Sequence, residues 1–269
     1  MGALHAGHLA LIERSQTECD RTVVSIFVNP TQFGPGEDLE RYPRDLAGDS
    51  RACQEAGVDA LFAPSTEEMY PAGPGDAAAR TLTRVCVSGL TERYEGAVRP
   101  GHFEGVATVC AKLFQIVQPN RAYFGQKDYQ QLLVVQRMVA DLNMPLAVVP
   151  VPTVREPDGL ALSSRNAYLT PEERAAGTAL YRALQEAARL FGGGERSAEE
   201  LKRSMHAILG AEPEVAVDYA EVADIHRLSP LDTIGDEAIA LGAIRVGQTR
   251  LLDNVLLGAT LNQHPRRAN

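Results

Sequence analysis

The sequence predicts an α/β protein: a doubly wound parallel sheet, followed by a smaller α+β domain. Three observations lead to this prediction. Short runs of β-branched and aromatic residues, such as 22–28 and 121–124, alternate with stretches of helical periodicity, such as 106–117. Alternating strands and helices favour parallel strands joined by right-handed crossovers. After Asn166 the pattern changes, because two helical stretches come first and strands without intervening helices follow.

The elements of the first part are expected in a regular order. Strand patterns cover 22–28, 59–63, 83–87, 121–124 and 146–150, and helical patterns cover 8–19, 45–57, 106–117 and 132–139. Residues 22–28 have the composition of a strand buried on both faces, and residues 83–87 that of an edge strand. This order indicates a Rossmann-like sheet, in which ligands bind at the carboxyl ends of the strands.

The second part begins with a strong helix signal. Thr170 is a capping residue, Pro171 suits the first helical position, and two glutamates fill the first turn. The helix is expected to reach residue 191. Ser197 is expected to cap a second helix that runs to about residue 209, and strands follow at 217–222, 237–241 and 250–256. We therefore expect a Rossmann-like domain over 1–166, a small α+β domain over 167–258, and a disordered tail over 259–269.

The composition narrows the possible partners and the compartment. A net charge of −9 and a pI near 5.2 argue against nucleic acid or an anionic membrane as the main partner. No apolar stretch is long enough to span a membrane, and residues 1–20 do not read as a secretory leader. The four scattered cysteines suit a reducing compartment, with Cys53 and Cys110 as core residues. We expect a cytoplasmic protein.

Three polar clusters stand out at helix starts and loops. His5-Ala6-Gly7-His8 opens a helix, where the two histidines share a face, the glycine permits close approach, and unpaired N–H groups attract anions. The other clusters are 125–128 and 162–166. Taken singly, they are more often surface histidines, a helix cap and a turn than functional sites. Together they supply the donors, cation and hydroxyls that a nucleoside triphosphate requires, and Asp128 is a candidate for placing Mg²⁺.

Six segments carry a resemblance to a known family. They are Met1-Gly-Ala-Leu-His-Ala-Gly-His8, Val24-Ser-Ile-Phe-Val-Asn-Pro-Thr-Gln-Phe33, Tyr42-Pro43-Arg44, Arg99-Pro-Gly-His-Phe-Glu-Gly-Val106, Phe124-Gly-Gln-Lys-Asp-Tyr-Gln-Gln131 and Asp158-Gly-Leu-Ala-Leu-Ser-Ser-Arg-Asn166. In these segments the chain resembles the pantothenate synthetase (pantoate–β-alanine ligase) family of the nucleotidylyltransferase superfamily. The resemblance covers nearly the whole chain. It implies ATP-dependent condensation of (R)-pantoate with β-alanine through pantoyl adenylate, releasing pyrophosphate and AMP, in a homodimer.

The resemblance also implies roles for individual residues. Gln32 and Gln131 would hold pantoate, and Gln32 would also meet β-alanine, since side-chain amides both donate and accept. His5, His8 and Lys127 are the expected catalytic residues, as donors to the departing pyrophosphate, and the family assigns His8 as proton donor. Val154 would lie beside the adenine, and the ligands of Mg²⁺ stay open. The expected ATP-binding residues are Met1, Gly2, Ala3, Leu4, His5, Ala6, Gly7, His8, Gly125, Gln126, Lys127, Asp128, Val154, Leu162, Ser163, Ser164 and Arg165.

Other polar residues are given structural roles. We expect Arg99 and His102 to form a turn and a helix cap rather than a substrate contact. His226 and His264 are expected at the surface, and Tyr42 in a flap over the site.

The family pattern includes a strand ahead of the first helix, and the printed sequence contains no such strand. We expect a start codon further upstream or a clipped chain. Two functions therefore stay open: an active ATP-dependent ligase, and a truncated, inactive nucleotide-binding protein acting as a binding module. Another adenylyl or cytidylyl transferase of the superfamily is a third alternative, against which the contexts of Gln32 and Gln131 argue.

Overall fold

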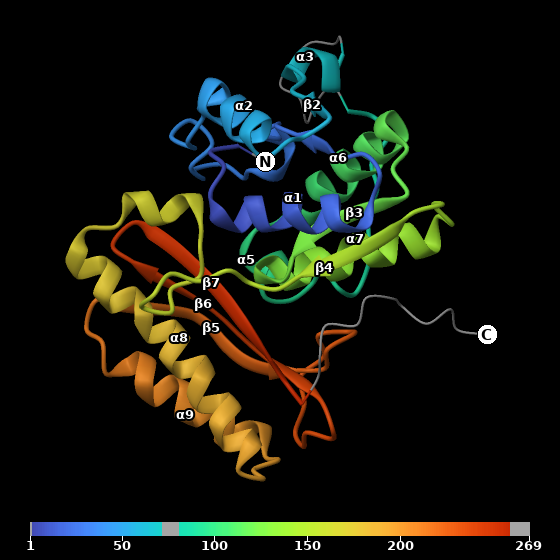
Figure 1. Ribbon diagram of the computed structural model, residues 1–269. Helices are drawn as coiled ribbons and strands as arrows, with labels where there is room; N and C mark the ends of the chain where they lie inside the picture. Colours follow the sequence, from blue (N-terminus) through green and yellow to red (C-terminus); the bar gives the residue numbers. More distant parts are fainter. Residues whose placement is uncertain (1, 72–80, 259–269) are drawn as a thin grey trace. The chain divides into compact units, whose positions relative to one another are not determined.

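The computed structural model describes residues 2–71 and 81–258 (Figure 1). These residues group into two compact units. Unit 1 holds residues 2–71, 81–125 and 130–151, and unit 2 holds residues 126–129 and 152–258. The domain bounds expected from the sequence stay a prediction, and the tail expected over 259–269 lies outside the described residues.

The first part of the chain has the expected α/β class. Strand β1 pairs in parallel with β2, and β3 pairs in parallel with β4, each with helices between the strands. The Cα partners run from Val23↔Ala60 in the first pair and from Arg121↔Ala147 in the second. The elements are α1 (Ala6–Glu18), β1 (Val23–Ser25), η1 (Pro30–Gln32), α2 (Leu46–Glu55), β2 (Ala60–Phe62), α3 (Thr66–Met69), α5 (Glu95–Val98), α6 (His102–Val117), β3 (Arg121–Gly125), α7 (Tyr129–Asp141) and β4 (Ala147–Val151).

Two strand predictions need correction. β1 is shorter than the expected 22–28, and Val23 is 44% exposed although Val24 is buried. In the described structure β1 pairs with β2 alone, so the expected burial on both faces is wrong at Val23. Residues 83–87 form no strand. Side chains of α6 hold this segment instead, since Thr108 Oγ1 accepts a hydrogen bond from the Val85 N–H and Glu104 pairs with Arg84.

Unit 2 is built on an antiparallel sheet in the order β5-β6-β7. The expected helix caps are confirmed: Thr170 and Glu173 form a reciprocal capping box, and the Ser197 hydroxyl accepts from the Glu200 N–H. The elements are η2 (Gln126–Asp128), η3 (Ser164–Tyr168), α8 (Pro171–Gly192), α9 (Ala198–Gly210), β5 (Val215–Ala223), β6 (Ala238–Val246) and β7 (Thr249–Leu257).

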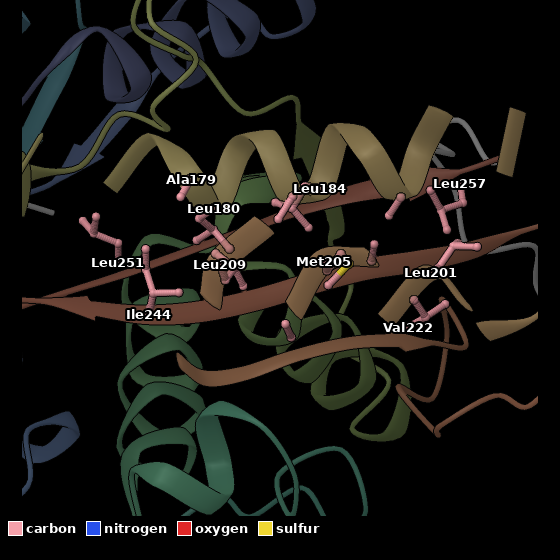
Figure 2. Packing of buried hydrophobic residues seen from close by; sticks show 14 of the residues in the cluster. Ala179, Leu180, Leu184, Leu201, Met205, Leu209, Val222, Ile244, Leu251 and Leu257 are labelled. Carbon is pink, nitrogen blue, oxygen red and sulfur yellow. The ribbon is translucent and has the colours of Figure 1, made fainter. Parts of the chain in front are cut away.

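The core of unit 2 lies between the two long helices and the sheet. Figure 2 shows Leu184 of α8 and Leu209 of α9 among the packed side chains, and both are fully buried. Gly177 lets α8 approach β7 closely, because a Cβ there would lie 2.8 Å from Leu251 Cδ1. This packing fixes the position of β7, and with it the polar residues on that strand.

The expectation that Cys53 and Cys110 are core residues is confirmed. Cys53 and Cys110 are buried, and all four cysteines are free thiols. Burial raises the pKa of the Cys110 thiol to about 12. Within residues 2–71 and 81–258, no helix is long and apolar enough to cross a membrane.

Candidate active site

The two histidines of the first motif form the cap of α1. The Gly7 N–H donates to Nδ1 of His5 at 3.1 Å, and the His5 N–H donates to Nδ1 of His8 at 3.3 Å. The rings lie 4.0 Å apart, centroid to centroid. This is a capping box in which imidazoles take the places usually held by serine or threonine and glutamate. The spacing of the motif is therefore explained by local hydrogen bonding.

The cap determines which ring nitrogen carries the proton. An imidazole nitrogen that accepts a hydrogen bond has no proton, so a neutral ring here carries its proton on Nε2. Both histidines then present Nε2–H as a donor at the start of a helix, where N–H groups also favour anions. Protonating Nδ1 would break the cap. The arrangement thus supplies neutral hydrogen-bond donors suited to phosphate oxygens.

Asp49 of α2, a residue that the motif analysis missed, holds the backbone ahead of these histidines. Its carboxylate is buried and accepts from the Ala3 N–H at 2.9 Å and from the Leu4 N–H at 2.7 Å. The Leu4 side chain packs on a small core that includes Ile12 and Val24. Two bonds to one carboxylate fix the path of residues 3–4, and so the entry into α1.

A cavity of about 510 Å³ opens beside this loop in unit 1. Its lining includes Gly2, Phe27 and Asp49, near the carboxyl ends of β1 and β2. That volume is within the usual range for small-molecule sites. Among the polar lining residues, Arg44 donates to the Leu39 and Tyr42 carbonyls. Tyr42, expected in a flap, packs edge-on against Phe33 at 5.7 Å.

Gln32, one of the two glutamines expected at pantoate, ends the short helix η1. Its side-chain oxygen accepts from Asn29 Nδ2 at 3.2 Å, which leaves the Gln32 NH₂ as the donating end of the amide. Asn29 is itself buried, and its Oδ1 accepts from the Tyr70 hydroxyl at 2.7 Å. The second glutamine, Gln131, lies half-buried in the first turn of α7.

His102 and Arg99 hold the main chain of Gln32. His102 Nδ1 donates to the Gln32 carbonyl at 2.8 Å, and Arg99 donates to His102 Nε2 at 3.1 Å and forms an ion pair with Glu37. Burial, followed by the Arg99 charge, lowers the pKa of His102 to about 4. These residues do more than form a turn, since they brace a residue expected to contact substrate.

The remaining expected residues gather in unit 2. A cleft of about 30 Å³ in this unit has room for one water. It is lined by Lys127, Ser163 and Arg165, and by Arg250 and Asp253 of β7. The Lys127 ammonium lies 3.7 Å from the Asp128 carboxylate. Three cations, Lys127, Arg165 and Arg250, line this cleft together with the Asp253 carboxylate, and Arg250 is paired with Asp218 at 2.6 Å.

Hydrogen bonds to nearby residues hold the loop that carries Ser163. Ser163 Oγ accepts from the Arg165 N–H at 3.3 Å and caps η3, and the Leu162 N–H donates to the Val154 carbonyl at 3.0 Å. Val154 and Leu162 are therefore neighbours, as are Ser163, Ser164 and Arg165.

The structure thus places the expected residues in two groups. Unit 1 holds Gly2 to His8, Gln32, Gly125 and Gln131, and unit 2 holds Gln126 to Asp128, Val154 and Leu162 to Arg165. Met1 and His264 lie outside the described residues. The His226 side chain is 71% exposed. Among the described residues, no group of three His, Cys, Asp or Glu side chains is placed to hold a metal ion.

Comparison with known proteins decides the family. The family model for pantoate-beta-alanine ligase matches residues 1–256 of the chain. The chain belongs to this family. It is 57% identical over 258 residues to the pantothenate synthetase of Rubrobacter xylanophilus, covering 96% of this chain and 89% of that protein. The pantothenate synthetase of Chloroflexus aggregans is also 57% identical, over 96% and 91%.

Solved structures show the same family relationship. A crystal structure of pantothenate synthetase from Thermus thermophilus has a TM-score of 0.90 and 55% identity, covering 95% of this chain and 90% of that one. A crystal structure of pantoate-beta-alanine ligase from Francisella tularensis, complexed with beta-gamma ATP and beta-alanine, has a TM-score of 0.76 and 34% identity, covering 97% and 89%. The family resemblance and the fold class inferred from the sequence are confirmed.

Proposed function

We propose that this protein joins (R)-pantoate to β-alanine in an ATP-dependent reaction, giving pantothenate, AMP and pyrophosphate. The match of the family model over residues 1–256 is the observation that carries this proposal. The ATP and β-alanine named for the Francisella tularensis complex support the same substrates here. The identity of 57% to curated pantothenate synthetases makes another transferase activity a weaker alternative.

The reaction consists of two displacements. A pantoate carboxylate oxygen attacks the α-phosphorus of ATP, the bond from that phosphorus to the bridging oxygen breaks, and pyrophosphate leaves with the electron pair. The β-alanine amine then attacks the acyl carbon of pantoyl adenylate, the bond to AMP breaks, and the nitrogen loses a proton. Aligning the reactants supplies much of the rate in displacements of this kind.

For the first displacement, we assign ATP to the two groups of residues described above. His5 and His8 act as neutral Nε2–H donors to phosphate oxygens, because their Nδ1 atoms accept backbone hydrogen bonds. Lys127, Ser163, Ser164 and Arg165 add charge and hydroxyl donors, which stabilise the charge that grows on pyrophosphate. A carboxylate nucleophile has no proton to lose, so His8 is proposed as a donor of a hydrogen bond rather than of a proton.

For pantoate, we assign Gln32 and Gln131. The orientation of Gln32 by Asn29 supports its role, since the NH₂ group is then presented to an acceptor such as a carboxylate. Gln32 is also proposed to contact β-alanine.

We further propose Mg²⁺ as the companion of ATP. This ion usually keeps several waters and takes one or two carboxylates plus phosphate oxygens, so a three-residue protein cluster is not required. Asp128 fits this arrangement, because its carboxylate is 48% exposed and lies beside Lys127. When bound, the ion would neutralise charge on the phosphates.

A cytoplasmic location and a homodimer complete the proposal. The four free cysteines support a reducing compartment. The homodimer is what the family resemblance implies for this chain. Sedimentation of the purified protein tests the dimer.

The test of the activity is release of AMP from ATP by the purified protein with pantoate and β-alanine. The proposal expects release that requires both. Equal release with other acid–amine pairs would overturn the substrate assignment, and no release by the folded protein would favour the inactive binding module.

A further inference from the structure

Strand β7 carries a buried polar pair to which the family resemblance gives no role. Asp253 is 4% exposed and Asn254 is 3% exposed. Buried polar side chains are costly unless their hydrogen-bonding groups are satisfied. The partners of this pair therefore indicate what it does.

The Asn254 amide is fully used, and all its partners lie in η2. Its NH₂ group donates to the Gln126 carbonyl at 3.0 Å and to the Lys127 carbonyl at 2.9 Å. Its oxygen accepts from Gln126 Nε2 at 3.2 Å. An asparagine amide offers two N–H donors and one oxygen, so each has a partner. One side chain thus holds the carbonyls of the two peptide bonds that flank the Lys127 Cα.

The carboxylate of the neighbouring Asp253 also has its hydrogen-bond partners within unit 2. Asp253 forms a two-pronged ion pair with Arg155, at 2.5 and 3.0 Å, and accepts from the Asn254 N–H at 2.8 Å. Arg155 also stacks on the Tyr181 ring, with 4.7 Å to the centroid. Burial raises the pKa of Asp253, and the nearby Arg155 and Lys127 charges oppose that rise.

We propose that Asn254 is a positioning residue for Lys127. By holding the Gln126 and Lys127 carbonyls, its amide keeps the Lys127 side chain at the cleft that Ser163 and Arg165 also line. The inference rests on the proposed role of Lys127 in binding ATP. It requires an amide at position 254, since an aspartate has no N–H to donate and would place an anion against two carbonyl oxygens.

A merely structural role would have a different signature. If Asn254 only attached η2 to the sheet, its replacement would lower stability and leave the kinetic constants for ATP unchanged. A positioning role makes the effect depend on Lys127. A double-mutant cycle separates the two, because coupled residues give non-additive effects.

The experiment compares Asn254→Ala, Asn254→Asp, Lys127→Ala and the two double variants, by thermal unfolding and by steady-state AMP release. Displacing Lys127 by a fraction of an ångström is expected to raise KM for ATP about 10-fold or more and to lower kcat. KM for β-alanine stays within about twofold of its normal value. In the Lys127→Ala background, the Asn254 substitutions cause no further loss.

Leu257→Ala is the matched control, because Leu257 is buried in the core on the same strand and lies outside η2. It is expected to lower the thermal midpoint with no change in KM for ATP. Equal losses from the Asn254 substitutions with and without Lys127 would overturn the inference alone. Normal ATP kinetics in Lys127→Ala would overturn both the proposed role of Lys127 and the inference. Should Asn254→Ala fail to fold, Asn254→Ser, whose hydroxyl keeps one donor and adds no charge, gives the same comparison.

Discussion

The His5–His8 loop of unit 1 and the Lys127 turn of unit 2 are both assigned to ATP, yet they are held in different ways. The histidines cap the helix that they begin, through bonds spanning two or three residues. The Lys127 turn is held by an amide 127 residues further along the chain. The histidine cap depends only on residues within one short motif. The second exists only once β7 has folded.

The largest effect on AMP release is expected from substitutions of His8, which belongs to the locally held His5–His8 loop. His8→Ala removes both the cap and a donor to the leaving group, and AMP release should fall about 10²- to 10³-fold, as for loss of one oxyanion donor. His8→Gln keeps a neutral donor and a capping-box residue, and should fall only about 10-fold. Steady-state assays measure both, with the exposed His206→Gln as control. Equal losses in the two variants would indicate that His8 donates a proton.

The next effect concerns His102 and pH. Its folded pKa of about 4 lies below the ordinary 6.5, so between these values the unfolded chain binds the extra proton. Stability from this group is therefore full above pH 6.5 and falls by about 3 kcal/mol as the pH drops to 4. Urea unfolding across that range measures it. His102→Asn keeps a donor for the Gln32 carbonyl and should lose this slope; an unchanged slope would contradict the assignment.

A smaller effect is expected at Asp49. Asp49→Asn leaves one of the two N–H groups of residues 3–4 without an acceptor, at a cost of about 1–3 kcal/mol in stability. Because the histidine loop then shifts, KM for ATP should rise about 10-fold. Asp45→Asn is the matched control, since Asp45 caps the same helix by accepting from the Gly48 N–H at 2.9 Å. If both substitutions change KM equally, Asp49 has no special role.

The smallest effect tests a local signal in unit 2. Thr170→Ala removes the side-chain cap of α8 and should lower the free energy of unfolding by about 1 kcal/mol. Thr170 bonds to Glu173 and not to η2, so KM for ATP should stay the same. Chemical unfolding and ATP kinetics on one preparation give both values. A rise in KM would show that the Lys127 turn depends on unit 2 more broadly than through Asn254.

The same contrast explains what the sequence could predict. Caps at Thr170 and Ser197 and the periodicity of α6 are local, and all were confirmed. The strand expected at 83–87 was wrong because its backbone bonds to Thr108, a side chain more than 20 residues away. Asp49 and Asn254 carry no motif of their own, so contacts spanning 45 and 127 residues could not be inferred from spacing.

The most direct test of the account is pantoate-dependent exchange of labelled pyrophosphate into ATP, measured without β-alanine. Reversible formation of pantoyl adenylate predicts exchange that requires pantoate, survives in His8→Gln and is largely lost in Lys127→Ala. Exchange that proceeds without pantoate, or that is unaffected by loss of Lys127, would contradict the account.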